Sequence, residues 1–332
     1  RAAEALQEMG FSDFERGRIL INIPRPLSIK PITTKSANPV FSVISEDGRY
    51  LFVKKMPLRE GYNVEKEVLE VLSELEGEGR YNKRFFPDIA PETFDFDNFL
   101  YLITELPDIP VLDPREVTRE RMRVLGRLHG LSPAIQRELE RKGLGNLLPD
   151  GKNYGDPSRL MGEINTHLKQ KYRFSPREVA RIVSLYNSSA RSLRDATRDS
   201  RHRRIVSPDT KDENWDSTIH LDFEKVRWGA RPESFSRVLF DKFAYDNSNV
   251  PDYLESFLEL SLFEETDTVE ADRWMPHTGP AFIEETSDLT LNAAFIDMLR
   301  LLHYNITTNK TDAKEHNKVY YANFRMLLNY YG

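Results

Sequence analysis

The segment from residue 205 to 229, IVSPDTKDENWDSTIHLDFEKVRWG, constrains the fold of this chain more than any other. It begins with an apolar pair that suits the end of a buried strand, followed by Asp209 and Asn214. Residues 215–221 then predict a tight hairpin, with turn residues at 216 and 217. Because Asp222 comes directly after this hairpin, we expect Asp209, Asn214 and Asp222 to converge.

These three side chains suit one kind of chemistry. An Asp that orients or deprotonates a hydroxyl, with an Asn and a second Asp that hold magnesium, is what phosphoryl transfer from a nucleotide requires. The D-x-x-x-x-N spacing is that of a kinase catalytic loop, and Asp222-Phe223-Glu224 stands where kinases carry D-F-G. An acidic, solvated turn is the alternative, since 53 of the residues are Asp or Glu. The hypothesis therefore depends on further kinase features upstream.

Composition restricts the class of protein. The 332 residues, 39% hydrophobic and 30% charged, are typical of a soluble globular protein with one large or two ordinary domains. A net charge of −6 argues against a partner with a nucleic-acid backbone. No apolar run approaches the roughly 20 residues of a membrane span. With no cysteine, disulfides and thiolate chemistry are excluded. We expect a cytoplasmic protein.

The N-terminal part predicts a small antiparallel sheet. Residues 2–9 are helical, and the chain is then extended or irregular through Pro26. Strands are expected at 27–32, 40–44 and 50–54. The loop between the first two strands contains the small or hydrogen-bonding residues Ser36, Ala37 and Asn38, in the place where a kinase covers the nucleotide phosphates.

The third strand ends in two lysines. Lys54 is favoured as the phosphate-binding lysine over Lys55, which points to the opposite face because strand side chains alternate. An amphipathic helix follows at 64–75, and Glu65, on its buried side, is the expected partner of the lysine, with Glu67 as the alternative.

A second hairpin and a series of helices follow. Residues 91–96 and 99–106 form strands around Asp97-Asn98, and a proline-bounded segment then leads to mainly helical sequence. The helix at 116–130 places His129 on its apolar face. Two helices are expected between 156 and 195, and others near 236–246, 251–263, 288–303 and 313–330.

Taken in order, these features resemble the aminoglycoside phosphotransferase and choline kinase group, which are small-molecule kinases with a protein-kinase-like fold. The matching stretches lie within residues 30–230 and are S-A-N-P-V-F at 36–41, F-V-K at 52–54, the Glu65 helix, L-I-T-E-L at 102–106, L-G-R-L-H-G-L at 125–131, and the Asp209, Asn214 and Asp222 segment. The resemblance implies an α+β, two-lobe fold: a small antiparallel-sheet lobe at 1–106 and a larger, mostly helical lobe at 107–332.

The resemblance also implies a role for each candidate residue. Asp209 would be the catalytic Asp, Asn214 and Asp222 ligands of Mg²⁺, and Lys54 the phosphate lysine, oriented by Glu65. The backbone at Glu105 and Leu106 would hold the base of ATP or GTP, below the loop of Ser36, Ala37 and Asn38. The partners expected are the nucleotide and a small metabolite or aminoglycoside-like acceptor, phosphorylated on a hydroxyl.

The chain departs from the pattern of this group in three places. Ser207-Pro208 replaces the usual His-Gly before the catalytic Asp, and the hairpin between Asn214 and Asp222 is shorter. Pro107, which has no N–H, follows the hinge. Two alternatives therefore remain: a catalytically altered pseudokinase that acts as a binding or scaffolding module, and an atypical protein kinase. The short segment after Asp222 favours a small acceptor over a protein.

The acceptor site is expected among the helices after residue 230, with loops at 263–267 and 274–277. The acidic residues of the first loop could attract a cationic acceptor. An ordinary solvated loop is the alternative.

Overall fold

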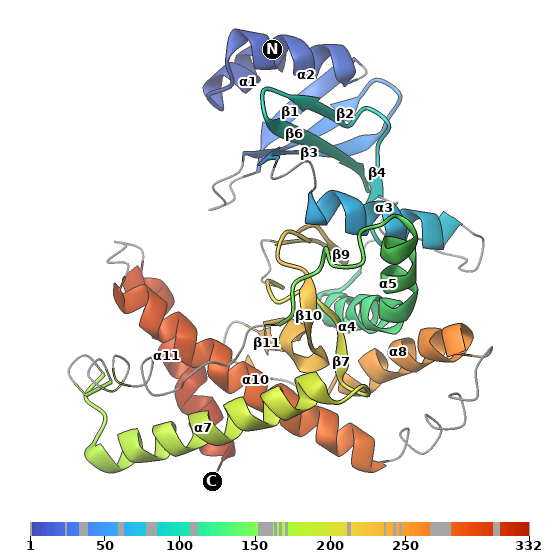
Figure 1. Cartoon of the computed structure of the whole chain (residues 1–332). Helices are drawn as coiled ribbons and strands as arrows, with labels where there is room; N and C mark the ends of the chain where they lie inside the picture. The colour runs from blue at the N-terminus through green and yellow to red at the C-terminus, as the bar shows by residue number, and fades with distance from the viewer. Residues whose placement is uncertain are drawn as a thin grey trace. The chain divides into compact units, whose positions relative to one another are not determined.

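The computed structural model describes most of the chain (Figure 1). The residues described are 2–23, 25–32, 39–58, 63–77, 85–106, 112–151, 162, 165, 168–169, 172–210, 214–235, 237–241, 244–245, 248–265, 280–307 and 313–331. They fall into two compact units. The first unit comprises Arg1–Val111, Arg137–Leu147 and Glu213–Glu224, and the second Leu112–Gln136, Leu148–Asp212 and Lys225–Gly332.

The first unit contains an antiparallel sheet with the order β1-β2-β3-β6-β4, and β5 pairs with β6 outside this path. Each predicted strand has a counterpart, but β5 covers only the last three residues of the strand predicted at 91–96, β3 extends three residues past Lys54, and β4 was not predicted. Asp97 and Asn98 form the turn of the β5–β6 hairpin with φ of 51° and 63°, a conformation that Asp and Asn tolerate better than most residues. The strands are β1 (Pro26–Pro31), β2 (Val40–Ser45), β3 (Tyr50–Pro57), β4 (Asp88–Ile89), β5 (Phe94–Phe96) and β6 (Phe99–Glu105).

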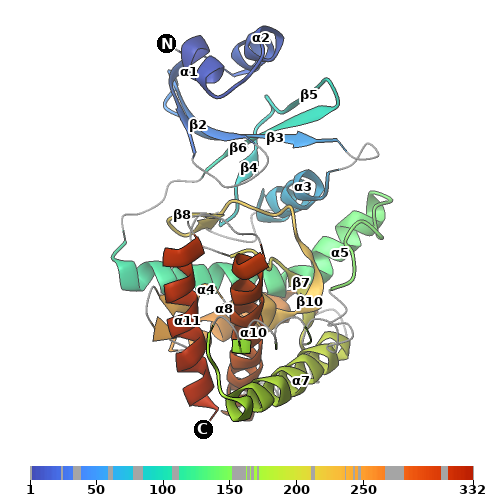
Figure 2. The same ribbon diagram turned by 90° about the vertical axis from the view of Figure 1, so that its left-hand side faces the viewer.

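Two helices, α1 (Ala2–Glu8) and α2 (Asp13–Asn22), cover one side of this sheet (Figure 2). Their buried side chains, such as Leu6 and Ile19, share a core with Phe41 and Val53 of the sheet. The prediction of irregular chain up to Pro26 is wrong over α2. A capping box explains this helix, because the side chain of Ser12 accepts from the backbone N–H of Glu15 while the side chain of Glu15 accepts from that of Ser12.

Helix α3 (Val64–Gly77) lies on the other side of the sheet (Figure 2), and it begins at the residue predicted. Its apolar stripe is buried, and so is Glu65 in its first turn. The short hairpin of β8 (Trp215–Asp216) and β9 (Ile219–His220) also belongs to the first unit, with Ser217 in the turn at a φ of 53°. The N–H of Leu221 donates to the carbonyl of Asn214 at 2.8 Å and closes the hairpin.

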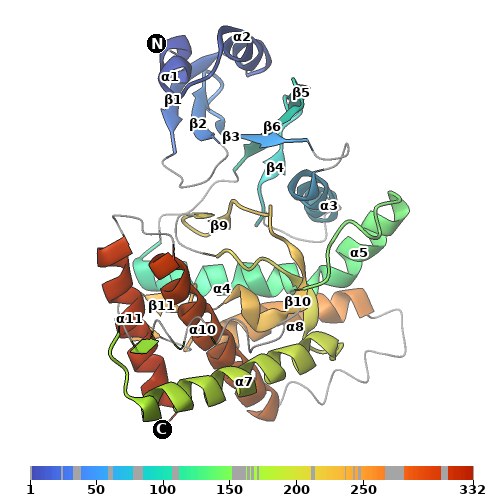
Figure 3. The ribbon, with the colours of Figure 1, turned by 60° about the vertical axis from the view of Figure 1, so that its left-hand side comes forward.

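The second unit is mostly helical (Figure 3). Helix α4 packs closely on α8, since a Cβ added to Gly126 would lie 2.4 Å from the carbonyl oxygen of Tyr253. Helices α10 and α11 lie side by side, and α7 packs against α10 (Figure 3). The helices that begin in this unit are α4 (Pro114–Gly130), α5 (Ser132–Arg141, whose last five residues fall in the first unit), α7 (Pro176–Arg198), α8 (Val250–Glu265), α10 (Pro280–Thr307) and α11 (Ala313–Tyr330).

Strands β7 (Arg203–Val206) and β10 (Arg227–Ala230) pair antiparallel in this unit, and the 3₁₀ helix η2 (Arg231–Ser234) follows β10. The predicted helix at 236–246 is wrong, because β11 (Phe240–Asp241) and β12 (Ala244–Tyr245) pair there as two antiparallel strands. Closely spaced aromatic residues in this segment favour extended pairing. The first of the two helices expected between 156 and 195 falls largely outside the described residues. None of the described helices combines the length and apolar character needed to cross a membrane.

Candidate active site

Strand β3 presents its two lysines to opposite sides of the sheet, as their alternation predicts. The Nζ of Lys54 lies 2.7 Å from Oε2 of Glu65 on α3, and the side chain of this glutamate is 1% exposed. Lys55 instead pairs with Glu15 of α2 and stacks 4.1 Å above the centre of the Phe99 ring. Of the alternatives that the sequence left open, the pair that meets is therefore Lys54 and Glu65.

Asp222 joins this pair from the segment that follows the β8–β9 hairpin. Its Oδ1 lies 3.0 Å from the Nζ of Lys54. The backbone N–H of Phe223 donates to Oε1 of Glu65 at 3.2 Å, which fixes the segment to α3. The Phe223 ring is fully buried and packs edge-on against Phe86. Three elements that are distant in the sequence thus bring one cation and two carboxylates together.

The charges of this cluster depend on one another. Burial disfavours the ammonium of Lys54, but the carboxylates of Glu65 and Asp222 hold its pKa above its usual range. Burial also opposes the charge of Asp222, yet Lys54 keeps the pKa of that carboxyl below its ordinary value. Burial raises the pKa of Glu65 to about 7, although Lys54 opposes the shift. Asp222 is therefore a carboxylate at neutral pH, as a metal ligand must be.

Asn214 lies beside Asp222, because its Nδ2 donates to Oδ2 of Asp222 at 3.2 Å. An amide oxygen and a carboxylate fit Mg²⁺, which prefers oxygen ligands and takes one or two carboxylates together with substrate phosphates. Among the described residues, no group of three or more His, Asp or Glu side chains is placed to hold a metal without such phosphates. The donor set of this hairpin therefore fits a magnesium ion that arrives with a nucleotide.

Glu105 and Leu106, whose backbone is predicted to hold the nucleotide base, border an apolar cluster in the first unit. Phe52, Leu106 and Ile219 are buried together, and partly buried apolar side chains of Ile32, Val40 and Leu221 pack against them. Phe52 precedes Lys54 by two residues on β3 and so lies on the same face of the sheet. The N–H of Leu106 donates to the carbonyl of Tyr50 at 3.3 Å. The predicted phosphate loop of Ser36, Ala37 and Asn38, and also Pro107, lie outside the described residues.

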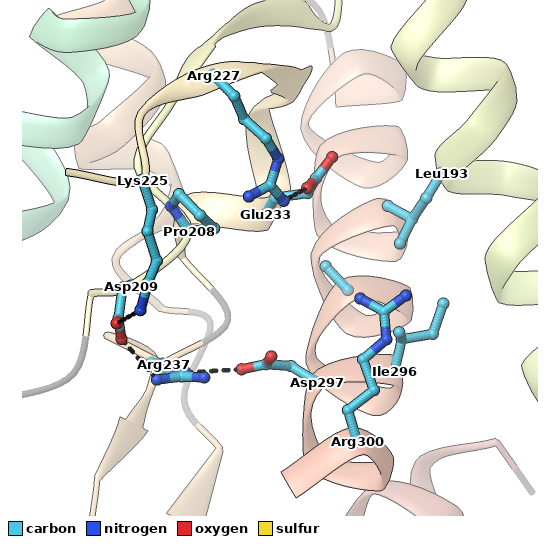
Figure 4. Close-up of a pocket in the computed structure, with 11 residues that line it drawn as sticks. Leu193, Pro208, Asp209, Lys225, Arg227, Glu233, Arg237, Ile296, Asp297 and Arg300 are labelled. Atoms are coloured by element: carbon cyan, nitrogen blue, oxygen red, sulfur yellow. Dashed lines mark hydrogen bonds and ion pairs between the residues drawn. The ribbon is translucent and has the colours of Figure 1, made fainter. Parts of the chain in front are cut away.

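Asp209 belongs to the second unit, where two cations bind its carboxylate. Oδ2 lies 2.7 Å from the Nζ of Lys225, and Oδ1 lies 2.8 Å from Nη1 of Arg237. The Nε of Arg237 also contacts Asp297 on α10 at 2.8 Å (Figure 4). The two ion pairs of Asp209 differ in strength, because the side chain of Lys225 is 60% exposed and that of Arg237 only 23%. Lys225 is therefore the partner that exchanges more readily.

The loop before Asp209 is held by a buried serine. The Oγ of Ser234 accepts from the backbone N–H of Ser207 at 3.1 Å and lies 3.0 Å from Nε2 of His129. Its carbonyl accepts from the hydroxyl of Thr210 at 2.6 Å. His129 comes from the apolar face of α4, and burial lowers its pKa well below the ordinary value, so the ring is neutral. These bonds anchor the loop on both sides of Asp209, although the usual His-Gly is replaced by Ser207-Pro208.

Replacing Ser234 by alanine is expected to lower the free energy of unfolding by about 1–3 kcal/mol, because the buried N–H of Ser207 and Nε2 of His129 each lose their hydrogen bond to its hydroxyl, although Nδ1 of His129 keeps Tyr253. Chemical denaturation measures this change. The control is Ser188→Ala on the exposed side of α7, which we expect to change stability by less than about 0.5 kcal/mol. Equal effects of the two substitutions would contradict the anchoring role of Ser234.

A cavity of about 290 Å³ opens beside Asp209 in the second unit (Figure 4). Its apolar side comes from Leu193, Pro208, Ala293 and Ile296. Its charged side, among the described residues, consists of the basic side chains Lys225, Arg227, Arg237 and Arg300 and the acidic side chains Asp209, Glu233 and Asp297. This volume is at the lower end of the range of small-molecule sites.

Sequence reasoning missed most of the residues around Asp209. Lys225 carried a weak signal, because it follows the Asp222 triplet directly. Arg237, in the segment after η2, carried none. Asp297 and Arg300 carried none either, since they are far from the motif in the sequence and reach the cavity only through the packing of α10. The loops predicted for the acceptor do not line this cavity in its described part, and residues 266–279 lie outside the described ranges.

Comparison with known proteins supports the fold. No protein-family model matches the chain, and no curated protein matches its sequence. The structure resembles choline kinase from Cryptosporidium parvum Iowa II, with 13% identity, a TM-score of 0.53 and coverage of 96% of this chain and 95% of the other. A mutant aminoglycoside 2'-phosphotransferase-IIIa in complex with GDP gives 11% identity, a TM-score of 0.53 and coverage of 94% of each chain.

Amicoumacin kinase hAmiN, solved with AMP-PNP, Ca²⁺ and Ami, gives 11% identity, a TM-score of 0.52 and coverage of 98% of this chain and 95% of the other. The fold is therefore that of the aminoglycoside phosphotransferase and choline kinase group, as the order of the sequence motifs predicts. It is an α+β, protein-kinase-like fold with a sheet-containing and a mostly helical part.

Proposed function

We propose that the protein is a phosphotransferase that moves the γ-phosphoryl group of a magnesium-bound ATP or GTP to a hydroxyl of a small molecule. The observation that carries this proposal is the cluster of Lys54, Glu65 and Asp222 with Asn214 beside it. A buried cation next to a carboxylate–amide pair suits the phosphates and the metal of a nucleotide. The resemblance in fold to kinases solved with nucleotides agrees with this chemistry.

In this proposal the first unit binds the nucleotide. Lys54, oriented by Glu65, would pair with phosphate oxygens, while Asn214 and Asp222 would hold magnesium. Bound magnesium would neutralise charge that develops on the transferred phosphoryl group. The backbone at Glu105 and Leu106, beside the cluster of Phe52 and Ile219, would contact the base. The loop of Ser36, Ala37 and Asn38 would cover the phosphates.

Asp209 would act on the acceptor. Its carboxylate would orient the acceptor hydroxyl and accept its proton as the oxygen attacks phosphorus. For that, the acceptor hydroxyl must reach one of the two carboxylate oxygens of Asp209. The exposed Lys225, which holds Oδ2, is the partner expected to yield, whereas Arg237 would keep the carboxylate in position through Oδ1.

The length of chain after Asp222 favours a small acceptor over a protein. Strand β10 begins at Arg227, and η2 follows it directly, which leaves four residues between Asp222 and the next regular element. An activation segment that binds a protein substrate needs more chain than this. A pseudokinase remains the second candidate, and Ser207-Pro208 before Asp209 is the feature that favours it.

The two lysines of β3 provide a matched test. Lys54→Met removes the cation but keeps the apolar stem, and we expect it to weaken binding of magnesium nucleotide about tenfold or more, because a charge-assisted contact with phosphate is lost. Lys55→Met changes the same residue type on the opposite face, and binding should stay within about twofold. Thermal stabilisation by ATP and GTP, with and without magnesium, measures both.

The activity itself is tested by nucleotide consumption in the presence of sugars, amino alcohols, nucleosides and aminoglycosides. Acceptor-dependent turnover that Lys54→Met abolishes supports the proposal. Nucleotide binding without turnover on any acceptor favours the pseudokinase. Absence of nucleotide binding by the wild type, or a larger effect of Lys55→Met than of Lys54→Met, would contradict the assignment of the nucleotide site.

A further inference from the structure

Arg237 joins two carboxylates that come from different elements of the second unit. Its Nη1 donates to Oδ1 of Asp209 at 2.8 Å, and its Nε donates to Oδ2 of Asp297 at 2.8 Å. Asp297 lies in α10, whereas Asp209 lies in the loop after strand β7 and Arg237 in the segment after η2. Figure 4 shows the guanidinium between the two carboxylates, with one on each side. Three separate segments are therefore connected through a single side chain.

The two contacts together fix the orientation of the guanidinium. This group is planar and its N–H bonds point in set directions, so contacts at Nε and at Nη1 define both its position and the tilt of its plane. The stem of an arginine has many rotamers, and a single contact would leave the group free to turn about that contact. Because Asp297 supplies the second contact, it determines where Arg237 holds Oδ1 of Asp209.

Both ion pairs of Arg237 are largely shielded from solvent. The side chains of Arg237 and Asp297 are 23% and 24% exposed, and that of Asp209 is 12% exposed. Burial disfavours the guanidinium, but Asp297 and Asp209 hold the pKa of Arg237 above its usual range, so the group stays charged at neutral pH. Salt screens such partly buried pairs less than exposed ones. The arrangement is therefore more persistent than the pair of Asp209 with Lys225, whose side chain is 60% exposed.

Position matters for a carboxylate that acts on a hydroxyl. Its oxygen must lie within about 2.6–3.2 Å of the hydroxyl whose proton it accepts. A misplacement of about 1 Å, caused by a substitution away from the reacting atoms, can cost on the order of 10²-fold in rate. A residue that holds Asp209 through Arg237 can therefore influence turnover without touching the acceptor. Asp297 also lines the cavity, so direct contact with the acceptor is the alternative role.

We propose that Asp297 is a positioning residue for the phosphoryl transfer: it fixes the guanidinium of Arg237, and Arg237 fixes the carboxylate of Asp209. The inference rests on the proposed function, since it concerns the carboxylate that accepts the proton in that reaction. It gives α10 a second role besides forming a wall of the cavity, because this helix then also holds the carboxylate that acts on the acceptor.

Steady-state kinetics of three variants test the role of Asp297. Asp297→Ala removes the contact to Nε of Arg237, and we expect kcat to fall about tenfold or more while the dissociation constant of the nucleotide stays within about twofold. Asp297→Asn should retain more of kcat, because its amide oxygen can still accept from Nε. Asp288→Ala is the matched control: Asp288 is exposed on the same helix and is not among the described residues that line the cavity, so kcat should stay within about twofold.

A double variant distinguishes a role through Arg237 from direct contact with the acceptor. Arg237→Met removes both contacts of the guanidinium, so we expect kcat to fall at least as far as in Asp297→Ala. If Asp297 acts through Arg237, adding Asp297→Ala to Arg237→Met lowers kcat by less than about twofold further. Direct contact of Asp297 with the acceptor would instead lower kcat of the double variant by its full factor of about ten. Chemical denaturation of each variant shows that folded proteins are compared.

A crystal structure of Asp297→Ala tests the same inference without turnover, and Asp297→Asn replaces this variant in both measurements if it does not fold. We expect the guanidinium of Arg237 to turn and the carboxylate of Asp209 to move by about 1 Å or more from its place in wild-type crystals. A carboxylate that stays in place, an unchanged kcat in Asp297→Ala, or multiplicative effects in the double variant would overturn the inference. A wild type without turnover on any acceptor would contradict the proposed function instead, and the position of Asp209 in the variant crystal would still decide whether Asp297 holds it.

Discussion

Asp222→Asn is expected to abolish turnover almost completely while leaving the fold intact. The asparagine keeps the shape of the side chain, and its oxygen can still accept from Lys54, which lies 3.0 Å away in the wild type. The negative charge that magnesium requires is lost. Removal of one group that stabilises transition-state charge lowers kcat on the order of 10²–10³-fold, and loss of a metal ligand should be at least as severe.

The diagnostic result is the behaviour of magnesium. In the wild type, we expect magnesium to increase thermal stabilisation by ATP or GTP, and in Asp222→Asn this increment should disappear. The control is Asp216→Asn, the same substitution in strand β8 of the same hairpin, which should retain both the increment and turnover. Near-wild-type turnover in Asp222→Asn would overturn the assignment of Asp222 as a metal ligand.

The parts of the fold that the sequence predicted are those with local causes. The β8–β9 hairpin formed in the predicted segment, with its turn at Ser217 and Thr218, one residue later than predicted. Helix α3 begins at Val64, where its apolar period begins. Strand alternation placed Lys54 and Lys55 on opposite faces, but it did not say which face meets Glu65. Helix α2, which was not predicted, decides this, because its Glu15 pairs with Lys55 and leaves Lys54 on the face that meets Glu65.

Apart from helix α2, the missed features have causes that depend on several elements at once. Helix α2 itself carries a local signal, the S-x-x-E capping box of Ser12 and Glu15. The anchoring of the Asp209 loop carried a weaker sequence signal, because Ser234 and His129 come from segments more than 100 residues apart. The charged lining of the cavity carried no sequence signal, since it arises only when α10 brings Arg300 beside strand β10 and the loop that holds Asp209.

The replacement of His-Gly by Ser207-Pro208 is compensated by hydrogen bonds from a distant segment. From the sequence, this change placed the geometry of the loop in doubt, and it motivated the pseudokinase alternative. In the structure the hydroxyl of Ser234 binds the N–H of Ser207, and its carbonyl binds the hydroxyl of Thr210. The backbone on both sides of Asp209 is therefore fixed without an imidazole at position 207. Only turnover by the wild type and its loss in a defined variant can separate the two candidate functions.

Asp209→Asn is that variant. Asparagine matches the size of the side chain but cannot accept the proton of the acceptor hydroxyl. General-base contributions are typically on the order of 10²–10⁴-fold, so we expect kcat to fall by that amount. The dissociation constant of the nucleotide should change by less than about tenfold, because the nucleotide is assigned to Lys54, Asn214 and Asp222 instead. Steady-state kinetics and equilibrium binding measure the two quantities separately.

The fold should tolerate Asp209→Asn, because Arg237 keeps Asp297 as a partner and Lys225 is largely exposed. Asp252→Asn is the matched control. Asp252 lies in the same unit and is bound by two arginines, Arg119 at 2.6 Å and Arg123 at 3.2 Å, as Asp209 is bound by two cations. It should lower stability by a similar amount and leave kcat unchanged. A pseudokinase would show no turnover in the wild type, and an enzyme that keeps its full kcat as Asp209→Asn would show that Asp209 is not the catalytic carboxylate.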